Sequence, residues 1–193
     1  SSASLLTIPY LYFKNMGSDG VKKSSIIAML NANYLKQNLE KKYKIYSQNK
    51  HSLVGHEFII DLNEFKSFGI TDKDIAKRLI DYSFHPPTMS WPIPNSLMIE
   101  PTESENLEEL NRFIDAMNNI YDEIIEIKDG KFPQDNNVLV NAPHSYSDLI
   151  DWKFDYSIEK ACYPMDTLKQ YKFWPSNPRI NDVYGDKNLK LKI

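Results

Sequence analysis

The sequence predicts an α+β domain in which a short sheet carries helices on one face. Apolar side chains recur at three- to four-residue spacing in three stretches, which predicts helices over residues 21–43, 71–83 and 105–127. Short runs rich in β-branched and other apolar residues predict strands over residues 44–47, 55–62 and 96–101. With 41% hydrophobic residues, the chain of 193 residues has enough apolar material to build a core beneath such a sheet.

Polar residues just before each apolar stretch predict where the helices begin, because a side-chain oxygen there accepts from the free backbone N–H groups. The expected caps are Ser18 or Asp19, Thr71 with Asp74 in the capping-box position, and Thr102 or Ser104. Pro86 requires the second helix to end before it, and Gly130 is expected to end the third helix.

Residues 131–193 lose this periodicity, and aromatic residues, prolines and Asn or Asp alternate there instead. Disordered tails avoid aromatic residues, so an irregular arm that packs on the same domain is expected. The chain is therefore divided into an α+β unit over residues 1–130 and an arm over residues 131–193. The aromatic residues expected to dock the arm are Phe132, Trp152, Phe154, Tyr163, Phe173 and Trp174.

Composition limits the classes of partner. The net charge is −3, so the surface has no overall attraction for nucleic acid or an anionic membrane. No apolar run approaches the ~20 residues that a membrane span requires. The single cysteine, Cys162, excludes a disulfide framework and a zinc site built from thiolates. The opening residues SSASLLTIPYLYF lack an initiator Met and a positive leader region, which indicates a cut edge within a longer protein.

The residues themselves show no complete catalytic set. A glycine-rich phosphate cradle, a nucleophile elbow and a zinc-binding H-E-x-x-H word are all missing from the sequence. His85 is the histidine best placed for function, because it lies in a loop stiffened by two following prolines. Glu100, Glu103 and Glu105 flank a helix start, where favourable interaction with the helix dipole explains them. Arg179 is expected either to bind a carboxylate or phosphate, or to pin the arm through a salt bridge.

A resemblance to a known family rests on the sequence motifs around His85. Residues 85–105 read HPPTMSWPIPNSLMIEPTESE, with AKRLIDYSF before them and NLEELNRFIDAM after them. Further words follow in the same order, including VGHEFIIDL, NAPHS and KFWPSNPRINDVYGD. Together they resemble the C-terminal region of the glycine dehydrogenase (decarboxylating) family, the P-protein of the glycine cleavage system. The resemblance runs from about residue 1 to about residue 188.

The resemblance implies a pyridoxal-phosphate enzyme of the aspartate-aminotransferase-like fold, in which this chain is the small C-terminal α+β domain that closes over the cofactor. In that family glycine is decarboxylated on pyridoxal phosphate, and the aminomethyl group passes to the lipoyl arm of the H-protein. The implied partners are glycine, the lipoylated H-protein and the large domain of the same enzyme, in a dimer or heterotetramer. The implied location is the bacterial cytoplasm or the mitochondrial matrix.

The sequence departs from the family at the cofactor lysine. The family carries that lysine in a His-Lys pair, whereas Lys50 and His51 stand in the reverse order, in a polar turn. No catalytic residue is therefore expected in this chain. The isolated chain is expected neither to bind the cofactor covalently nor to decarboxylate glycine.

The resemblance further implies that the turn after the second helix faces the cleft between the two domains. Its prolines would then stiffen a channel wall for the lipoyl arm, because their φ is fixed in advance. The candidate substrate or lipoyl-channel residues are His85, Pro87, Thr88, Ser90, Trp91, Glu103 and Arg179.

An alternative hypothesis is a free-standing binding module with a ferredoxin-like order of elements, which recruits a protein partner through its aromatic arm. The two hypotheses differ in what the natural reading frame encodes upstream. A lysine-bearing α/β domain there favours the enzyme, and a Met near Ser1 favours the module. RNA binding is disfavoured by the acidic charge balance and by the lack of an aromatic RNA-binding strand.

Overall fold

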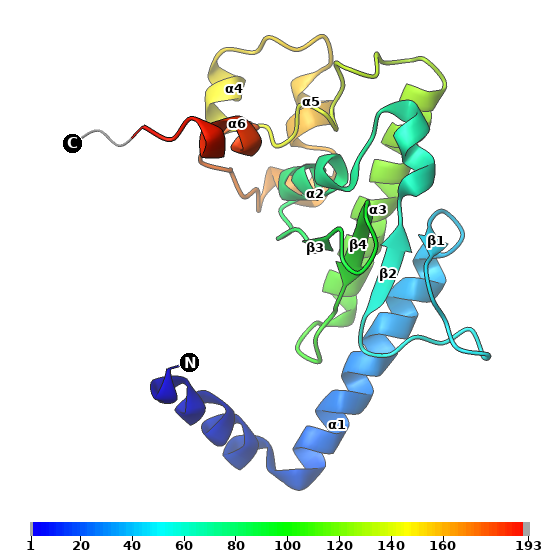
Figure 1. Cartoon of the computed structure of the whole chain (residues 1–193), viewed down its shortest axis with the longest axis vertical. Helices are drawn as coiled ribbons and strands as arrows, with labels where there is room; N and C mark the ends of the chain where they lie inside the picture. The colour runs from blue at the N-terminus through cyan, green and yellow to red at the C-terminus, as the bar shows by residue number, and fades with distance from the viewer. Residues whose placement is uncertain (1, 191–193) are drawn as a thin grey trace.

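The computed structural model describes residues 2–190, and a four-stranded antiparallel sheet lies at its centre. The spatial order is β1-β2-β4-β3. The strands are β1 (Lys44–Ile45), β2 (Phe58–Asp61), β3 (Thr88–Met89) and β4 (Ser96–Ile99). Helices α1 (Thr7–Leu39) and α3 (Leu107–Lys128) run side by side behind the sheet (Figure 1), which confirms the predicted α+β class.

The core lies between the sheet and these two helices. The register pairs Phe58 with Ile99 and Ile60 with Leu97, and all four side chains are at most 4% exposed. Alternate residues of a strand point to opposite faces, so these two pairs form one continuous apolar face. The hydroxyl of Tyr43 donates to the backbone oxygen of Met117 at 2.7 Å and joins the end of α1 to α3.

The first helix is longer than predicted and is kinked. It begins at Thr7 and is interrupted at Gly17, so Ser18 and Asp19 are the first helical residues after the kink, close to the predicted start but not as its cap. Gly17 takes φ 63° and ψ 178°, a conformation open almost only to glycine, and the chain changes direction there. The residues before Gly17 run back at an angle to the rest of α1 and stand apart from the sheet (Figure 1).

The other two predicted helices are present, with one cap corrected. Helix α2 (Asp72–Asp81) begins at the predicted capping box, in which Thr71 and Asp74 bond reciprocally. Helix α3 is capped by Asn106, whose side chain accepts from the backbone N–H of Glu109 at 2.8 Å. Thr102 and Ser104 lie in the turn before Asn106, where their hydroxyls bond each other instead, so their predicted capping role is wrong.

The strands are shorter than predicted, and β3 was not predicted. The proline-rich words around it favour loop, but Thr88 and Met89 pair with β4 at the sheet edge, where prolines before a strand are tolerated. After α1 the elements follow the order β–β–α–β–β–α. A ferredoxin-like domain has the order β–α–β–β–α–β, so that part of the alternative hypothesis is wrong.

The segment after α3 contains short helices joined by irregular chain. These are α4 (Tyr146–Ile150), α5 (Ile158–Cys162) and α6 (Asp182–Lys187), with the 3₁₀-helix η3 (Asp166–Lys169) between α5 and α6. Two further 3₁₀-helices lie earlier in the chain, η1 (Ala3–Leu6) before α1 and η2 (Asn63–Phe68) after β2. Five of the six predicted docking aromatics are partly buried against the core. Phe173 is 61% exposed and does not dock the arm, because its neighbours Lys172 and Trp174 make the contacts instead.

Candidate functional site

A pocket of about 340 Å³ lies where the loop after α2 meets the start of α3. Three of the candidate residues line it, namely His85, Pro87 and Thr88. Its apolar lining comes from Leu35, Met98, Leu110, Phe113 and neighbouring residues, and its polar lining includes Glu100, Glu105 and Glu109. The pocket therefore combines apolar sides with an acidic margin that is open to solvent.

The loop that carries His85 is fixed by contacts on both sides. Ser83 takes a left-handed conformation with φ 61°, which turns the chain out of α2. The next side chain, Phe84, packs edge-on against Phe113 at 5.2 Å between ring centroids. The guanidinium of Arg112 lies 3.6 Å from the centre of the Phe84 ring and donates to the Tyr82 backbone oxygen at 2.9 Å. This side of the pocket is consequently rigid.

The charged and titratable side chains at the pocket differ in whether they already have a hydrogen-bond partner. The carboxylate of Glu109 accepts two hydrogen bonds from Arg112, at 2.6 and 2.7 Å, and these bonds lower the pKa of Glu109. His85 is exposed, and its Nδ1 lies 3.1 Å from the backbone oxygen of Pro86. None of the lining residues forms a nucleophile–base pair. The arrangement can bind and orient a ligand, but it holds no group set to cleave one.

Ser90 and Trp91 lie outside this pocket, in the hairpin loop between β3 and β4. The hydroxyl of Ser90 donates to Asp72 at 2.5 Å and accepts from the backbone N–H of Asn95 at 3.1 Å. The Asn95 side chain in turn bonds the backbone of Asp72 and Leu62, both at 2.7 Å. Trp91 is 63% exposed on this braced loop, so it is presented outward and is not part of the core.

The last two candidates hold segments of the chain together. Glu103 accepts from the Tyr12 hydroxyl at 2.6 Å and lines a separate depression beside α1. Arg179 forms an ion pair with Asp74 at 2.6 Å and donates to the backbone oxygen of Val140 at 2.6 Å. Of the two interpretations of Arg179, the structure shows the salt bridge that pins the arm.

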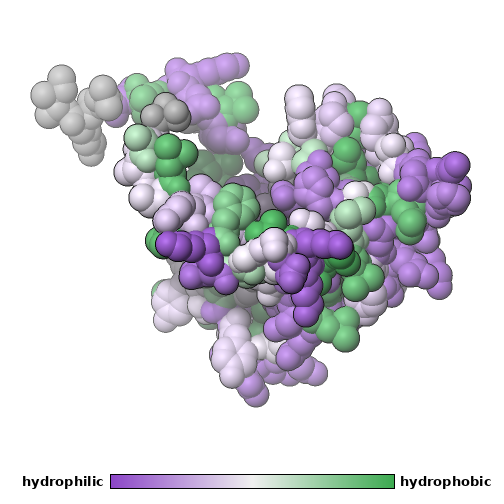
Figure 2. All heavy atoms as spheres, turned by 90° about the horizontal axis from the view of Figure 1, so that it is seen from below, coloured by the Kyte–Doolittle hydropathy of each residue, from purple (hydrophilic) through white to green (hydrophobic). Residues whose placement is uncertain are grey.

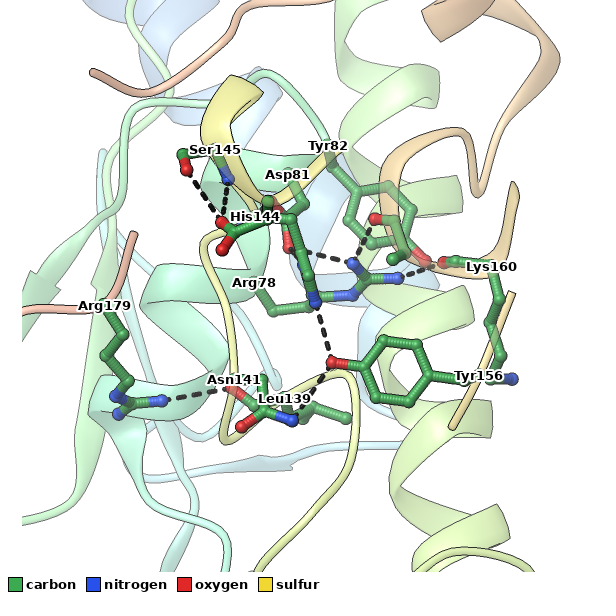
Figure 3. A network of polar contacts seen from close by, with 12 residues as sticks. Arg78, Asp81, Tyr82, Leu139, Asn141, His144, Ser145, Tyr156, Lys160 and Arg179 are labelled. Atoms are coloured by element: carbon green, nitrogen blue, oxygen red, sulfur yellow. Dashed lines mark hydrogen bonds and ion pairs between the residues drawn. The ribbon is translucent and has the colours of Figure 1, made fainter. Parts of the chain in front are cut away.

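A buried polar network was missed by the sequence reasoning (Figure 3). Arg78, Asp81 and His144 are each 0% exposed. Arg78 donates to Glu123 at 2.6 and 3.0 Å, to Asp81 at 2.9 Å, and to two backbone oxygens of α5. All five N–H groups of the guanidinium therefore have a partner. The sequence feature that could have revealed this network is the three-residue spacing of Arg78 and Asp81, which places both on the buried face of α2.

His144 lies in the arm and joins it to this network. Its Nδ1 lies 2.7 Å from Asp81, and its Nε2 lies 2.8 Å from the Tyr156 hydroxyl. Burial acts to raise the pKa of the Asp81 carboxyl, but the hydrogen bond from His144 and the charge of Arg78 outweigh it, so that pKa lies below its usual range. The network is fully paired and closed to solvent, which makes it a structural joint between α2, α3 and the arm.

Comparison with known proteins decides the family. The family model described as "Glycine dehydrogenase, C-terminal domain" matches residues 24–144, which is more than half of the chain. The chain belongs to this family. The matched range of this glycine dehydrogenase C-terminal domain contains the whole pocket and ends at His144 of the buried network.

The curated relatives that the chain matches are much longer than the chain itself. It is 52% identical over 191 residues to the mitochondrial glycine dehydrogenase (decarboxylating) of Dictyostelium discoideum, which covers 97% of the chain and 19% of that relative. The glycine dehydrogenases (decarboxylating) of Proteus mirabilis and Teredinibacter turnerae are each 49% identical, over 97% of the chain and 20% of the relative. The chain thus spans about a fifth of the length of the curated relatives it matches.

The relatives occur in the two settings that the resemblance implied. The Dictyostelium relative is named as mitochondrial, and the other two come from bacteria. Among the helices of residues 2–190, none has both the length and the apolar character to cross a bilayer.

The residues of this glycine dehydrogenase C-terminal domain do not by themselves fit pyridoxal phosphate. The cofactor requires a lysine that can form an imine, and no lysine lines the pocket beside His85. Lys50 and His51 are exposed in a turn, and neither lines the pocket beside His85. Within residues 2–190, no three His, Cys, Asp or Glu side chains are grouped to hold a metal ion either. No chemical step is therefore assigned to this part of the molecule.

Proposed function

We propose that this chain is the C-terminal part of a glycine dehydrogenase (decarboxylating), the P-protein of the glycine cleavage system. The complete enzyme would decarboxylate glycine and transfer the aminomethyl group to the lipoyl arm of the H-protein. Pyridoxal phosphate, held by a lysine outside this chain, would supply the electron sink for decarboxylation. The family match and the names of the relatives support this proposal.

The observation that carries the proposal is the rigid, open pocket beside His85. A volume of about 340 Å³ lies within the usual range for small-molecule sites. Its sides are mostly apolar, which suits the hydrocarbon chain of a lipoyl group. Its lack of a nucleophile or lysine suits a wall that guides a ligand toward chemistry performed elsewhere.

The candidate residues would take different parts in this function. His85, Pro87 and Thr88 would form the channel wall itself, since they line the pocket. Ser90 would brace the neighbouring loop, from which Trp91 would contact the large domain. Glu103 and Arg179 would act at a distance by fixing the segments that frame the cleft. The proposed partners are glycine, the lipoylated H-protein and the large domain, assembled as a dimer or heterotetramer.

Substitution of His85 tests the channel wall. In the complete enzyme, His85→Ala is expected to slow aminomethyl transfer to lipoylated H-protein by about tenfold, because a side chain that orients the arm is lost. The melting temperature is expected to stay unchanged, since His85 is exposed and makes no long-range hydrogen bond. The matched control is His51→Ala, an exposed histidine in a turn away from the pocket.

The outcome that would contradict the channel role is a parallel loss of transfer and of thermal stability in His85→Ala. The binding-module alternative is tested separately, by the coding sequence that adjoins this chain. A domain with an imine-forming lysine upstream supports the enzyme, whereas a start codon at residue 1 supports the module.

A further inference from the structure

The helical segment over residues 5–16 exposes an unusual amount of apolar surface. Its eight large apolar or aromatic side chains are 37% to 69% exposed: Leu5, Leu6, Ile8, Tyr10, Leu11, Tyr12, Phe13 and Met16. Figure 2 views the molecule from the end where this segment lies, and apolar side chains show at the surface there. Single exposed apolar residues are ordinary on protein surfaces, but a contiguous patch marks an interaction site.

The apolar side chains surround the helix instead of forming one stripe. With about 100° of rotation per residue, the positions from Leu11 round to Tyr10 cover an arc of about 260°. Thr7 and Lys14 fall in the remaining arc and form a narrow polar strip, and Asn15 is the polar residue within the apolar arc. A helix that is apolar on almost every side is buried in the assembly where it functions.

The segment has little that could hold it in place within this chain. Gly17 sets it at an angle to the rest of α1, and within residues 2–190 its long-range hydrogen bond is the one from the Tyr12 hydroxyl to Glu103, at 2.6 Å. Isolated helices shorter than about 12–15 residues are marginal in water. The segment therefore requires a partner to remain helical.

We propose that the large domain of the same enzyme buries the helical segment over residues 5–16, so that this segment anchors the C-terminal domain to it. The inference rests on the proposed function. In the relatives, about four fifths of the polypeptide lies outside the part that this chain matches, which provides the body needed to cover the helix.

The all-round pattern favours the large domain over a second copy of this chain. A two-fold contact between two such helices buries a single stripe on each, as in a coiled coil. It would leave much of the arc from Leu11 to Tyr10 in water. A groove within a larger body can enclose the helix on several sides and leave only the strip of Thr7 and Lys14 at its mouth.

Hydrogen exchange gives the first test. In the 193-residue chain, the backbone amides of residues 8–16 are expected to exchange quickly, since few contacts oppose local opening. In the complete enzyme the same amides are expected to exchange at least about 100-fold more slowly. Equally fast exchange in both proteins would overturn the proposal.

A pair of neighbouring substitutions gives the second test. Leu11→Glu is expected to lower the melting temperature of the complete enzyme by about 4 °C or more, because it buries a charge in the interface. The same change should leave the melting temperature of the 193-residue chain unaltered. Lys14→Glu is the matched control, and it should have no effect in either protein. A complete enzyme that tolerates Leu11→Glu as well as Lys14→Glu would contradict the inference.

Photo-crosslinking identifies the protein surface that covers residues 5–16. A benzoylphenylalanine in place of Phe13 in the complete enzyme is expected to crosslink to the large domain of the same polypeptide. A crosslink between residues 5–16 of two copies would overturn the proposal in favour of a dimer contact. If the adjoining reading frame encodes no large domain, the proposed function itself fails. A complete decarboxylase with an unprotected segment would refute this inference alone.

Discussion

Arg78 and Asp81 are charged residues that the fold buries completely. A charge removed from water is costly unless it is paired and hydrogen-bonded, and here every donor of Arg78 has an acceptor. Asp81 accepts from Arg78, from the His144 side chain and from the His144 backbone N–H, at 2.7 to 2.9 Å. Losing one member therefore leaves the others buried without compensation.

Asp81→Asn is predicted to lower the free energy of unfolding at neutral pH by about 3–5 kcal/mol, because Arg78 loses a buried counter-charge. The pKa of Asp81 is lowered in the folded chain, so its contribution is fully present above the unfolded value of about 3.9 and is lost as pH falls through the lower folded value. Urea unfolding of both proteins should show the difference shrinking below about pH 4.

The control for this experiment is Asp135→Asn, which changes an exposed carboxylate in a turn. It is expected to alter the free energy of unfolding by less than about 0.5 kcal/mol at either pH. A difference between the Asp81 variant and the parent chain that stays constant down to pH 2 would refute the assigned role of its charge.

The boundaries and directions of the helices depend on a few local features, namely two helix caps and one glycine kink. The capping box of Thr71 and Asp74 fixes the start of α2, and thus the direction in which Arg78 and Asp81 enter the core. Asn106 does the same for α3. Gly17 has the opposite effect, since it separates α1 into a packed part and a projecting part.

Thr71→Ala is predicted to lower the free energy of unfolding by about 1 kcal/mol, because the hydroxyl that donates to the Asp74 carboxylate at 2.6 Å in the capping box is lost. Thr71→Ser keeps a hydroxyl in the same position and is expected to retain most of that stability. Thermal unfolding followed by circular dichroism compares the two variants. Equal destabilisation by both would show that the methyl group of Thr71, and not its hydroxyl, stabilises the helix.

At the scale of the whole molecule, the described residues form an α+β unit with an arm packed against it and a pocket beside His85. The arm is tied to the body by the ion pair of Arg179 with Asp74 and by the bond between His144 and Asp81. The pocket beside His85 and the exposed Trp91 occupy separate positions on the loops around β3. Both features agree with the proposal that this domain closes against a larger partner.

The 193-residue chain is predicted to form no stoichiometric imine with pyridoxal phosphate. Borohydride reduction followed by mass spectrometry should detect only trace labelling spread over exposed lysines, because no lysine lines the pocket. The complete enzyme is expected to trap one cofactor per active site under the same conditions. Full labelling of a single lysine in the isolated chain would show that this part carries a cofactor site of its own.

The sequence by itself determined what short-range patterns encode. The apolar spacing of residues 71–83 and 105–127 predicted α2 and α3, and the pair of Thr71 and Asp74 predicted a helix start. The words of residues 85–105 were sufficient to identify the family. These features could be predicted because helical periodicity, capping residues and family sequence motifs depend on residues that are close together in the chain.

Tertiary structure alone decided how distant residues meet. It placed His144 beside Asp81 across 63 residues of sequence, and it separated His85 from Trp91, only six positions away. It also paired Thr88 and Met89 into an edge strand, although the prolines around them favour loop. Such contacts depend on how helices and strands pack in space, and a buried charge can be recognised as paired only when both partners are brought together.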